Sequence, residues 1–327
     1  MKKFIKTLII ISFLSSVSYA DSVDFKIFDF TVNKESGKNF IKSVSQNNSD
    51  ISDDNVKPVK NTADENNSVK SLPDIEVSEN DGLYIIKIDT KKVGNLFQPY
   101  YVTHLTTNRE VFDNTNARLV INAGFFDPKN HQTVSYLTLN GKTILDPHNN
   151  KNLMGNKYLE PYMDKILNRS ELRVLKSKTD DSLLYDIAPH NEPVPRGYEL
   201  IHAIQGGPAL APVLRLEEEF FVITDDEGKI ISQSASCLSK YARTLIGIKN
   251  NNIYFVIATK SRPITLIEAS DIMKAAGFSK AMAYDGGGSV SLDYRDKDIH
   301  IVSDKNETAR KLKSFWVVLP ENSDSQN

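Results

Sequence analysis

Cysteine is nearly absent from this chain, since Cys237 is the only one among its 327 residues. A lone thiol cannot form an internal disulfide, so the fold must be held together by an apolar core. Long apolar runs are also lacking. Beyond a short run at residues 8–14, no segment is apolar over the length that a transmembrane helix needs. These two absences exclude a disulfide-stapled scaffold and a multi-span membrane protein.

Other absences narrow the chemistry. The six histidines are scattered, and none forms a His-x-His, His-Glu-x-x-His or Cys/His pair at metal-ligand spacing. The sequence contains no Walker loop for phosphates and no Gly-x-Ser-x-Gly nucleophile elbow. Lys and Arg number 40 against 42 Asp and Glu, and the two signs are interleaved, which argues against a basic face. We therefore predict no resident metal, no cofactor and no nucleic-acid partner.

The N-terminus has the order of a secretory signal. Three lysines precede the apolar run, and Ser18-Tyr19-Ala20 supplies the small residues that signal peptidase needs. We predict a signal peptide over residues 1–20 and a secreted or periplasmic protein with no stable membrane insertion after cleavage. An uncleaved membrane anchor is the alternative that this pattern leaves open.

The rest of the chain divides by composition. Apart from a short strand-like pattern at residues 24–32, residues 21–80 are dominated by Asn, Ser, Asp and Lys. Such a segment cannot bury enough apolar surface to offset its ordering entropy, so it is predicted to be a polar, mostly disordered linker. Residues 321–327 are predicted to be a frayed tail. Residues 81–320 remain as one predicted globular domain.

The predicted domain is a dense series of strand-like runs, several of which alternate at period two. They lie at residues 83–88, 100–105, 117–121, 135–139, 220–224, 243–248, 253–258, 280–284, 289–294 and 314–319. The clearest helix covers residues 266–276, between a Thr265/Glu268 capping box and Gly277. A second helix is expected at residues 157–167, within an insertion (145–196) that otherwise carries little secondary structure. The pattern indicates an α+β fold, with a mixed β-sheet core and a few packed helices.

The segment around Asp285 has the strongest functional pattern. A short apolar run ends at Asp285, passes through Gly286, Gly287 and Gly288, and resumes at Ser289 as an alternating segment. Consecutive glycines are entropically costly and are tolerated where the backbone takes positive φ or lets a ligand approach closely. A carboxylate beside bare backbone N–H groups can act as an acid, a base or an acceptor at an anion-binding concavity. A glycine-rich hairpin turn is the simpler alternative.

Three further strand ends carry glycine or polar groups beyond what packing requires. The residues are Asn122 and Gly124, then Gln205 with Gly206 and Gly207, and finally Arg243. An Asn amide can fix a sugar hydroxyl or a phosphate oxygen, and a guanidinium fork matches phosphate geometry. Ordinary turns and a structural ion pair of Arg243 are the alternatives. Asp127 before Pro128 and Glu268 in the capping box are weaker candidates because each has a ready structural role.

Taken together and in order, these segments resemble the phosphodiester glycosidase family. The motifs are Asn122-Ala-Gly-Phe-Phe-Asp127, Gln205-Gly-Gly-Pro208, Ala242-Arg-Thr-Leu-Ile-Gly247, the helix with Leu266-Ile-Glu-Ala-Ser-Asp-Ile-Met273, and Asp285-Gly-Gly-Gly-Ser289. The resemblance covers residues 82–320, and Arg310 is similar to the family's arginine before its final strand. Ala123 departs from the pattern, because many relatives have a second glycine there.

The resemblance implies hydrolysis of a sugar-1-phosphodiester at the sugar C1–O bond, releasing a free sugar and a phosphomonoester. Such a reaction builds cationic character on the sugar and negative charge on the departing phosphate. Asp285 would then activate water or stabilise the sugar cation, Arg243 would hold the phosphate, and Asn122 would orient a hydroxyl. The implied substrate-binding residues are Gly124, Gln205, Gly206, Gly207, Gly286, Gly287, Gly288, Ser289 and Arg310.

Two other functions remain open at this point. A non-catalytic envelope module that binds phosphorylated glycans would keep the same loops without turning substrate over. A metal-dependent phosphoesterase would cut the phosphorus–oxygen bond and would require a metal ion.

We expect export with cleavage after Ala20, because the basic, apolar and small-residue regions follow in the order that signal peptidase recognises. Intact-mass measurement of the exported protein should find a chain that begins at Asp21. An exported protein that retains Met1 would contradict this expectation.

Overall fold

The computed structural model describes residues 25–27, 30–32, 73–234, 237–303 and 309–321, and the chain divides into two units, residues 1–50 and 51–327. In the first unit, strands β1 (Phe25–Ile27) and β2 (Phe30–Val32) pair as an antiparallel hairpin. This hairpin lies at the strand-like pattern of residues 24–32. The predicted signal peptide, most of the predicted linker and most of the predicted tail lie outside the described residues.

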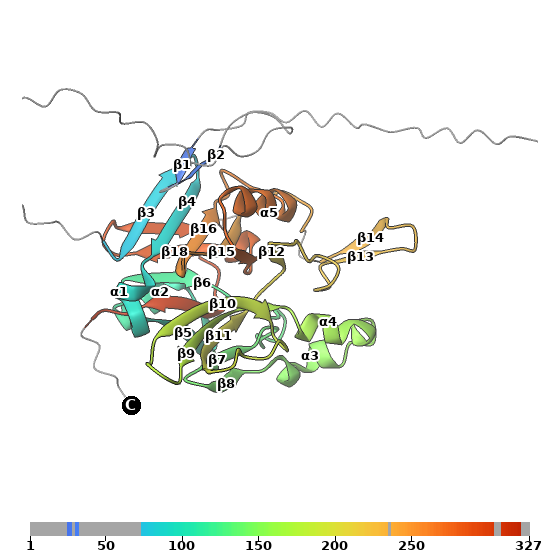
Figure 1. Cartoon of the computed structure of the whole chain (residues 1–327). Helices are drawn as coiled ribbons and strands as arrows, with labels where there is room; N and C mark the ends of the chain where they lie inside the picture. Colours follow the sequence, from blue (N-terminus) through green and yellow to red (C-terminus); the bar gives the residue numbers. More distant parts are fainter. Residues whose placement is uncertain (1–24, 28–29, 33–72, 235–236, 304–308, 322–327) are drawn as a thin grey trace, which may run out of the picture. The chain divides into compact units, whose positions relative to one another are not determined.

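Three sheets make up the second unit (Figure 1). Sheet I has the order β12 (Ala209–Ala211), β17 (Lys280–Ala283), β15 (Arg243–Lys249), β16 (Asn252–Ala258), β4 (Leu83–Ile88), β3 (Ile75–Asn80). Sheet II has the order β10 (Leu183–Pro189), β9 (Ser170–Ser177), β11 (Tyr198–Gln205), β7 (Leu137–Leu139), β8 (Lys142–Leu145). Sheet III has the order β19 (Ile299–Val302), β18 (Ser291–Tyr294), β6 (Leu119–Asn122), β20 (Leu312–Val318), β5 (Phe97–Thr106). A separate hairpin joins β13 (Val222–Thr224) and β14 (Ile230–Gln233).

The helices are short. They are α1 (Thr90–Val93), α2 (Asn108–Thr115), α3 (Lys151–Met154), α4 (Met163–Leu167) and α5 (Leu266–Ala275), with 3-10 turns η1 (Gly94–Leu96), η2 (Pro147–Asn149), η3 (Glu160–Tyr162) and η4 (Gly287–Ser289). The predicted capping box of α5 is confirmed, because the Thr265 and Glu268 side chains each bond the other's backbone N–H. The α5 helix packs on β12, where Ser270 Oγ donates to Leu210 O at 2.7 Å. The α+β class is therefore confirmed.

One apolar core is shared by all three sheets, as expected of a single domain. Its largest members include Ile86 from sheet I, Leu172 and Ile204 from sheet II, and Phe97 and Trp316 from sheet III. The rings of Phe97 and Trp316 stack with their centroids 4.6 Å apart. Each of these side chains is essentially inaccessible to solvent, so the sheets are held together mainly by apolar burial.

Tyr284, immediately after β17, forms a polar junction inside this core. Its hydroxyl accepts a hydrogen bond from Trp316 Nε1 at 2.7 Å and donates one to Ile204 O at 3.2 Å. Trp316 belongs to sheet III and Ile204 to sheet II, while β17 belongs to sheet I. Complete burial raises the pKa of Tyr284 well above its ordinary value, so the hydroxyl stays neutral. One side chain therefore connects the three sheets.

Two expectations require correction. The predicted linker reached residue 80, yet Ile75–Asn80 is a strand that pairs with β4, and Asp74 bonds Arg118 at 2.9 Å. The predicted insertion at residues 145–196 was expected to lack strands, yet it contains β9 and β10. Strand β9 was not recognised from the sequence because its charged residues are typical of an exposed segment. In the structure Glu171 and Arg173 are buried as an ion pair. The second helix was found in part, as η3 followed by α4.

Strand direction is also simpler than expected. We predicted a mixed sheet, but every strand pair among the described residues is antiparallel. Most neighbouring strands that follow each other in the chain are joined by short turns, and such turns impose antiparallel pairing.

The Cys237 thiol is fully buried and lies 3.3 Å from Phe221 O, and burial raises its pKa.

Across the part of the chain that the structure describes, no helix has the length and apolar character that a bilayer span requires.

We expect a chain that starts at Leu72 to fold, whereas a chain that starts at Gly82 should be clearly less stable. The shorter chain lacks β3 and with it the buried Ile75 and Val77. Losing two such side chains should lower the melting temperature by on the order of 10 °C. Thermal unfolding followed by circular dichroism gives the melting temperature of both chains. Equal melting temperatures would show that β3 does not contribute to the cooperative unfolding of the domain.

Candidate functional site

Asp285 lies just beyond the end of β17, and its carboxylate is held by one hydroxyl and faces one guanidinium. Ser289 Oγ donates to Asp285 Oδ2 at 2.6 Å, and Arg310 Nη1 donates to the same Ser289 Oγ at 3.3 Å. Ser289 is fully buried, Asp285 is partly buried and Arg310 is exposed. The three side chains therefore form a line, in which the buried Ser289 hydroxyl links the Asp285 carboxylate to the exposed Arg310 guanidinium.

The electrostatics of this line favour a titratable carboxylate. Burial raises the pKa of Asp285 to about 6, although the Ser289 hydrogen bond and the Arg310 charge both act to lower it. A carboxyl group with a pKa near neutrality can exchange protons with a substrate or with water near physiological pH. The cluster of Asp285, Ser289 and Arg310 is therefore the best candidate for chemistry in the described chain.

The three glycines after Asp285 suit close contacts at two positions and a positive φ at the third. A Cβ added to Gly288 would lie 2.9 Å from Arg310 Nη2, and one added to Gly286 would lie 3.0 Å from Ala242 O and 3.5 Å from Arg243 Nη1. Gly287 has φ +59°, which side-chain-bearing residues rarely adopt. The loop thus passes between two arginines, Arg243 at one end and Arg310 at the other.

The row of free N–H groups expected from these glycines is smaller in the structure. Gly287 N donates to Ala242 O at 2.8 Å, and Ser289 N donates to Gly286 O at 3.2 Å. Those amides hold the loop in place and cannot also bind an anion. An anion at this loop would therefore depend more on guanidinium groups than on backbone N–H groups.

Arg243 is buried, and its described hydrogen bonds go to main-chain oxygens. Nε donates to Ile264 O at 3.1 Å and Nη2 donates to Ser239 O at 2.8 Å. Burial lowers its pKa, although the value stays far above neutrality for a guanidinium. Arg243 therefore supplies a fixed positive charge beside Gly286.

Asn122, expected to orient a substrate hydroxyl, holds the Asp285 loop instead. Its Nδ2 donates to Asp285 O at 2.7 Å, while its Oδ1 accepts from Thr244 Oγ1 at 2.7 Å and from Ser291 N at 3.1 Å. The next residue, Ala123, accepts from Asp285 N at 3.0 Å. Asn122 is 1% exposed, so its amide is committed to positioning Asp285.

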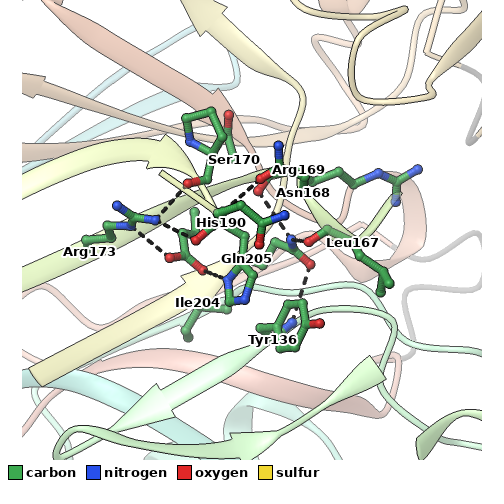
Figure 2. Close-up of polar contacts among 12 residues, drawn as sticks. Tyr136, Leu167, Asn168, Arg169, Ser170, Arg173, His190, Ile204 and Gln205 are labelled. Carbon is green, nitrogen blue, oxygen red and sulfur yellow. Dashed lines mark hydrogen bonds and ion pairs between the residues drawn. The ribbon is translucent and has the colours of Figure 1, made fainter. Parts of the chain in front are cut away.

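Gln205 is likewise used inside the protein, as Figure 2 shows. Its Nε2 donates to Leu167 O at 2.8 Å and to Arg169 O at 3.2 Å, and its Oε1 accepts from Tyr136 N at 3.4 Å. The side chain is fully buried. Its geometry favours a structural role over the predicted contact with substrate.

The neighbouring glycines of that segment serve chain packing. A Cβ at Gly206 would lie 2.7 Å from the Tyr284 ring, and one at Gly207 would lie 2.3 Å from Glu219 Oε2. Gly207 N donates to Ala283 O at 2.8 Å, which ties this segment to the end of β17. These glycines thus support the position of Asp285 from behind.

The remaining candidates occupy structural positions. Gly124 N donates to Ser314 Oγ at 3.1 Å, and an added Cβ would meet Ser135 at 2.9 Å. The Asp127 carboxylate accepts from Lys129 N at 2.8 Å and from Asn152 Nδ2 at 2.9 Å, which is turn chemistry. Glu268 belongs to the α5 capping box and pairs with Lys240 at 3.3 Å.

Two residues that support the site were missed from the sequence. Thr244 contacts Asn122, and Glu219 is a fully buried carboxylate that accepts from Ser170 Oγ at 2.7 Å and from Ala209 N at 3.1 Å. Thr244 follows Arg243 directly, so the motif that indicated Arg243 could also have indicated Thr244. Glu219 lies in the charged run Glu217-Glu218-Glu219, where nothing distinguishes the buried carboxylate from two exposed ones.

Among the described residues, no group of three or more His, Cys, Asp or Glu side chains has the arrangement of a metal site.

Residues 115–319 match the sequence profile of the phosphodiester glycosidase family. Among solved structures, the catalytic domain of zebrafish N-acetylglucosamine-1-phosphodiester alpha-N-acetylglucosaminidase, auto-inhibited by its pro-peptide, has a TM-score of 0.54 at 13% identity, over 77% of this chain and 85% of that chain. A hypothetical protein from Synechocystis has a TM-score of 0.50 at 14% identity, over 75% and 61% of the two chains. A putative exported protein from Burkholderia pseudomallei has a TM-score of 0.51 at 11% identity, over 73% and 74%. These structural likenesses show a shared fold, and no curated protein sequence matches the chain.

We expect Thr244→Val to destabilise the protein by about 1–2 kcal/mol, because it removes a buried hydroxyl donor from Asn122 with little change in volume. Thr244→Ser keeps the donor and should recover much of that loss. Urea unfolding of the two variants and the wild type measures the difference. Equal stability of the valine and wild-type proteins would show that this contact does not hold the Asp285 loop.

Proposed function

Because the chain belongs to the phosphodiester glycosidase family, and is a hydrolase of that type, we propose that it hydrolyses the sugar C1–O bond of a sugar-1-phosphodiester at Asp285. The observation that carries the proposal is the line of Asp285, Ser289 and Arg310, in which a carboxylate of raised pKa is linked through the Ser289 hydroxyl to an exposed guanidinium. Such an arrangement offers a proton acceptor and a phosphate-binding cation to one substrate.

The bond changes are those of a glycoside hydrolysis with a phosphate leaving group. Water attacks the anomeric carbon as the C1–O bond breaks, and the electron pair of that bond leaves on the oxygen of the phosphomonoester. The transition state has oxocarbenium character on the sugar. In this proposal ionised Asp285 accepts the proton of the attacking water, or stabilises the sugar cation, and the sugar leaves with a free C1 hydroxyl.

The phosphate side of the site would be supplied by Arg310 and Arg243. Arg310 is exposed and can approach the phosphate directly, in the bidentate manner that guanidinium groups allow. Arg243 is buried against Gly286 and adds a fixed positive field behind the loop. Negative charge that grows on the leaving phosphate would be stabilised by both groups.

The glycan is proposed to be processed outside the cytoplasm. The basic, apolar and small-residue order of residues 1–20 supports export, and one relative of the same fold is described as a putative exported protein. A secreted or periplasmic hydrolase would meet phosphorylated envelope or extracellular glycans as substrates.

The decisive experiment incubates purified mature protein with a panel of sugar-1-phosphodiesters and measures free reducing sugar. Release of sugar supports the hydrolase, whereas binding without release supports a non-catalytic glycan-binding module. Reaction in ¹⁸O-labelled water shows whether the C1–O bond or the phosphorus–oxygen bond is cut. Label in the sugar indicates cleavage of C1–O, and label in the phosphate indicates a phosphoesterase.

Asp285→Asn is expected to lower kcat by about 10²–10⁴-fold, the usual scale for a positioned acid or base. The substitution preserves shape but removes charge and basicity. The melting temperature should stay the same or rise, because the folded state no longer buries an ionised carboxylate. Asp127→Asn alters a carboxylate that accepts from Lys129 N and Asn152 Nδ2 and has no described bond to the cluster; it is the matched control and should keep nearly full activity.

The pH dependence should follow the same carboxylate. If Asp285 acts ionised, kcat/KM should rise as the pH increases through about 6 and then level off. Ser289→Ala removes a hydrogen bond that lowers the pKa of Asp285, so the rising limb should move to higher pH. Initial rates across pH 4–9, which flank the Asp285 pKa of about 6, measure this dependence. If the rising limb of kcat/KM lies at the same pH in Ser289→Ala as in the wild type, a group other than Asp285 causes the titration.

A further inference from the structure

A groove of about 600 Å³ follows strand β5 at the edge of sheet III. Along part of it, β5 departs from its partner: Tyr101 pairs with Ser314 and Thr106 pairs with Leu312, so four residues of β5 face only Lys313. Lys313 Nζ donates to Thr103 O at 2.8 Å and holds this excursion in place. The groove is therefore built into the strand, and its volume lies within the range of about 300–1,000 Å³ of ligand sites.

The lining of the groove combines flat rings with uncharged polar groups. Tyr100, Tyr101 and His104 provide rings, Gln98 and Asn114 provide amides, and none of the described residues that line it is Lys, Arg, Asp or Glu. Rings of this kind pack against the C–H faces of sugars, and amides both donate to and accept from sugar hydroxyls. The absence of lining charge disfavours a polyanion.

The rings are already ordered by the fold. Tyr101 packs against the main core and Tyr100 packs against the apolar cluster beneath α2, so these two rings lie on opposite faces of β5 and the exposed His104 ring is the one most open to a sugar. Side chains that are fixed before binding lose little conformational entropy when a ligand arrives. His104 and Asn114 are exposed and remain accessible to a ligand.

The groove also lies beside the candidate active site. Thr106 lines the groove and pairs with Leu312, which is two residues along the chain from Arg310. Two residues span at most about 7 Å of chain. An extended ligand that occupies the groove would therefore have one end near the guanidinium of the Asp285 cluster.

From these observations we propose that the β5 groove binds the uncharged sugar residues of an extended glycan. The substrate is then a phosphodiester within or at the end of an oligosaccharide chain, and the groove selects chains over a single phosphorylated sugar. The assignment of the ligand as the enzyme's substrate depends on the proposed function, whereas the binding of uncharged sugars does not.

The test is affinity electrophoresis and titration calorimetry of the mature protein with uncharged hexasaccharides. The probes are the hexamers of β-1,4-linked glucose, α-1,4-linked glucose, β-1,4-linked N-acetylglucosamine and α-1,6-linked mannose. At least one should bind, and His104→Ala and Tyr101→Ala should each weaken that binding by about 2- to 10-fold. Tyr158→Ala removes an exposed aromatic ring outside the groove and should bind as the wild type does.

His104 is exposed, so its variant stays informative if Tyr101→Ala is destabilised. Binding of none of the four hexamers overturns the proposal, and so does binding that both groove variants leave unchanged. These measurements need no turnover, so the two proposals can fail separately. If the protein hydrolyses small phosphodiesters but binds no hexamer, only the proposed sugar-binding groove is contradicted. If it binds a hexamer through His104 but hydrolyses nothing, only the proposed function is contradicted.

Discussion

The hydroxyl of Tyr284 fixes the geometry on which the candidate site depends. It joins Trp316 of sheet III to Ile204 of sheet II, and Tyr284 itself continues directly from sheet I. Asp285 is the next residue, so the position of its backbone is set by all three sheets at once. A buried neutral hydroxyl with both a donor and an acceptor satisfied rigidifies a core without the desolvation cost of a charge. The backbone that carries this carboxylate is therefore held by the core.

The local elements were the part of the fold that the sequence could predict. The Thr265/Glu268 box predicted α5 because capping depends only on residues within one turn of each other. Strand β9 was missed although Leu172 and Val174 alternate, because Glu171 and Arg173 looked like solvent-facing charges. In the structure Arg173 also donates to three main-chain oxygens, from Pro189, His190 and Glu192. Burial of a charge is decided by partners distant in sequence, which a linear pattern does not contain.

The candidate site could be predicted as a set of strand ends but not as a set of roles. Asn122 and Gln205 are polar groups beside glycines, and the sequence cannot distinguish an amide that faces a ligand from one that faces the protein. In the structure both side-chain NH2 groups donate to main-chain oxygens. By contrast, Arg310 is 21 residues from Ser289, and only folding brings its guanidinium to the hydroxyl that donates to the Asp285 carboxylate. The residues left to face a substrate are thus fewer than the motifs suggest.

The burial of Cys237 gives this protein a built-in reporter of its own opening. Its thiol is inaccessible and of raised pKa, so an alkylating reagent can reach it only when the surrounding structure separates. Because the chain has no second thiol, the rate of modification counts openings at one place without mutation or extrinsic dye. Because this single thiol is buried, the folded molecule also has no exposed sulfhydryl through which two copies could become covalently linked.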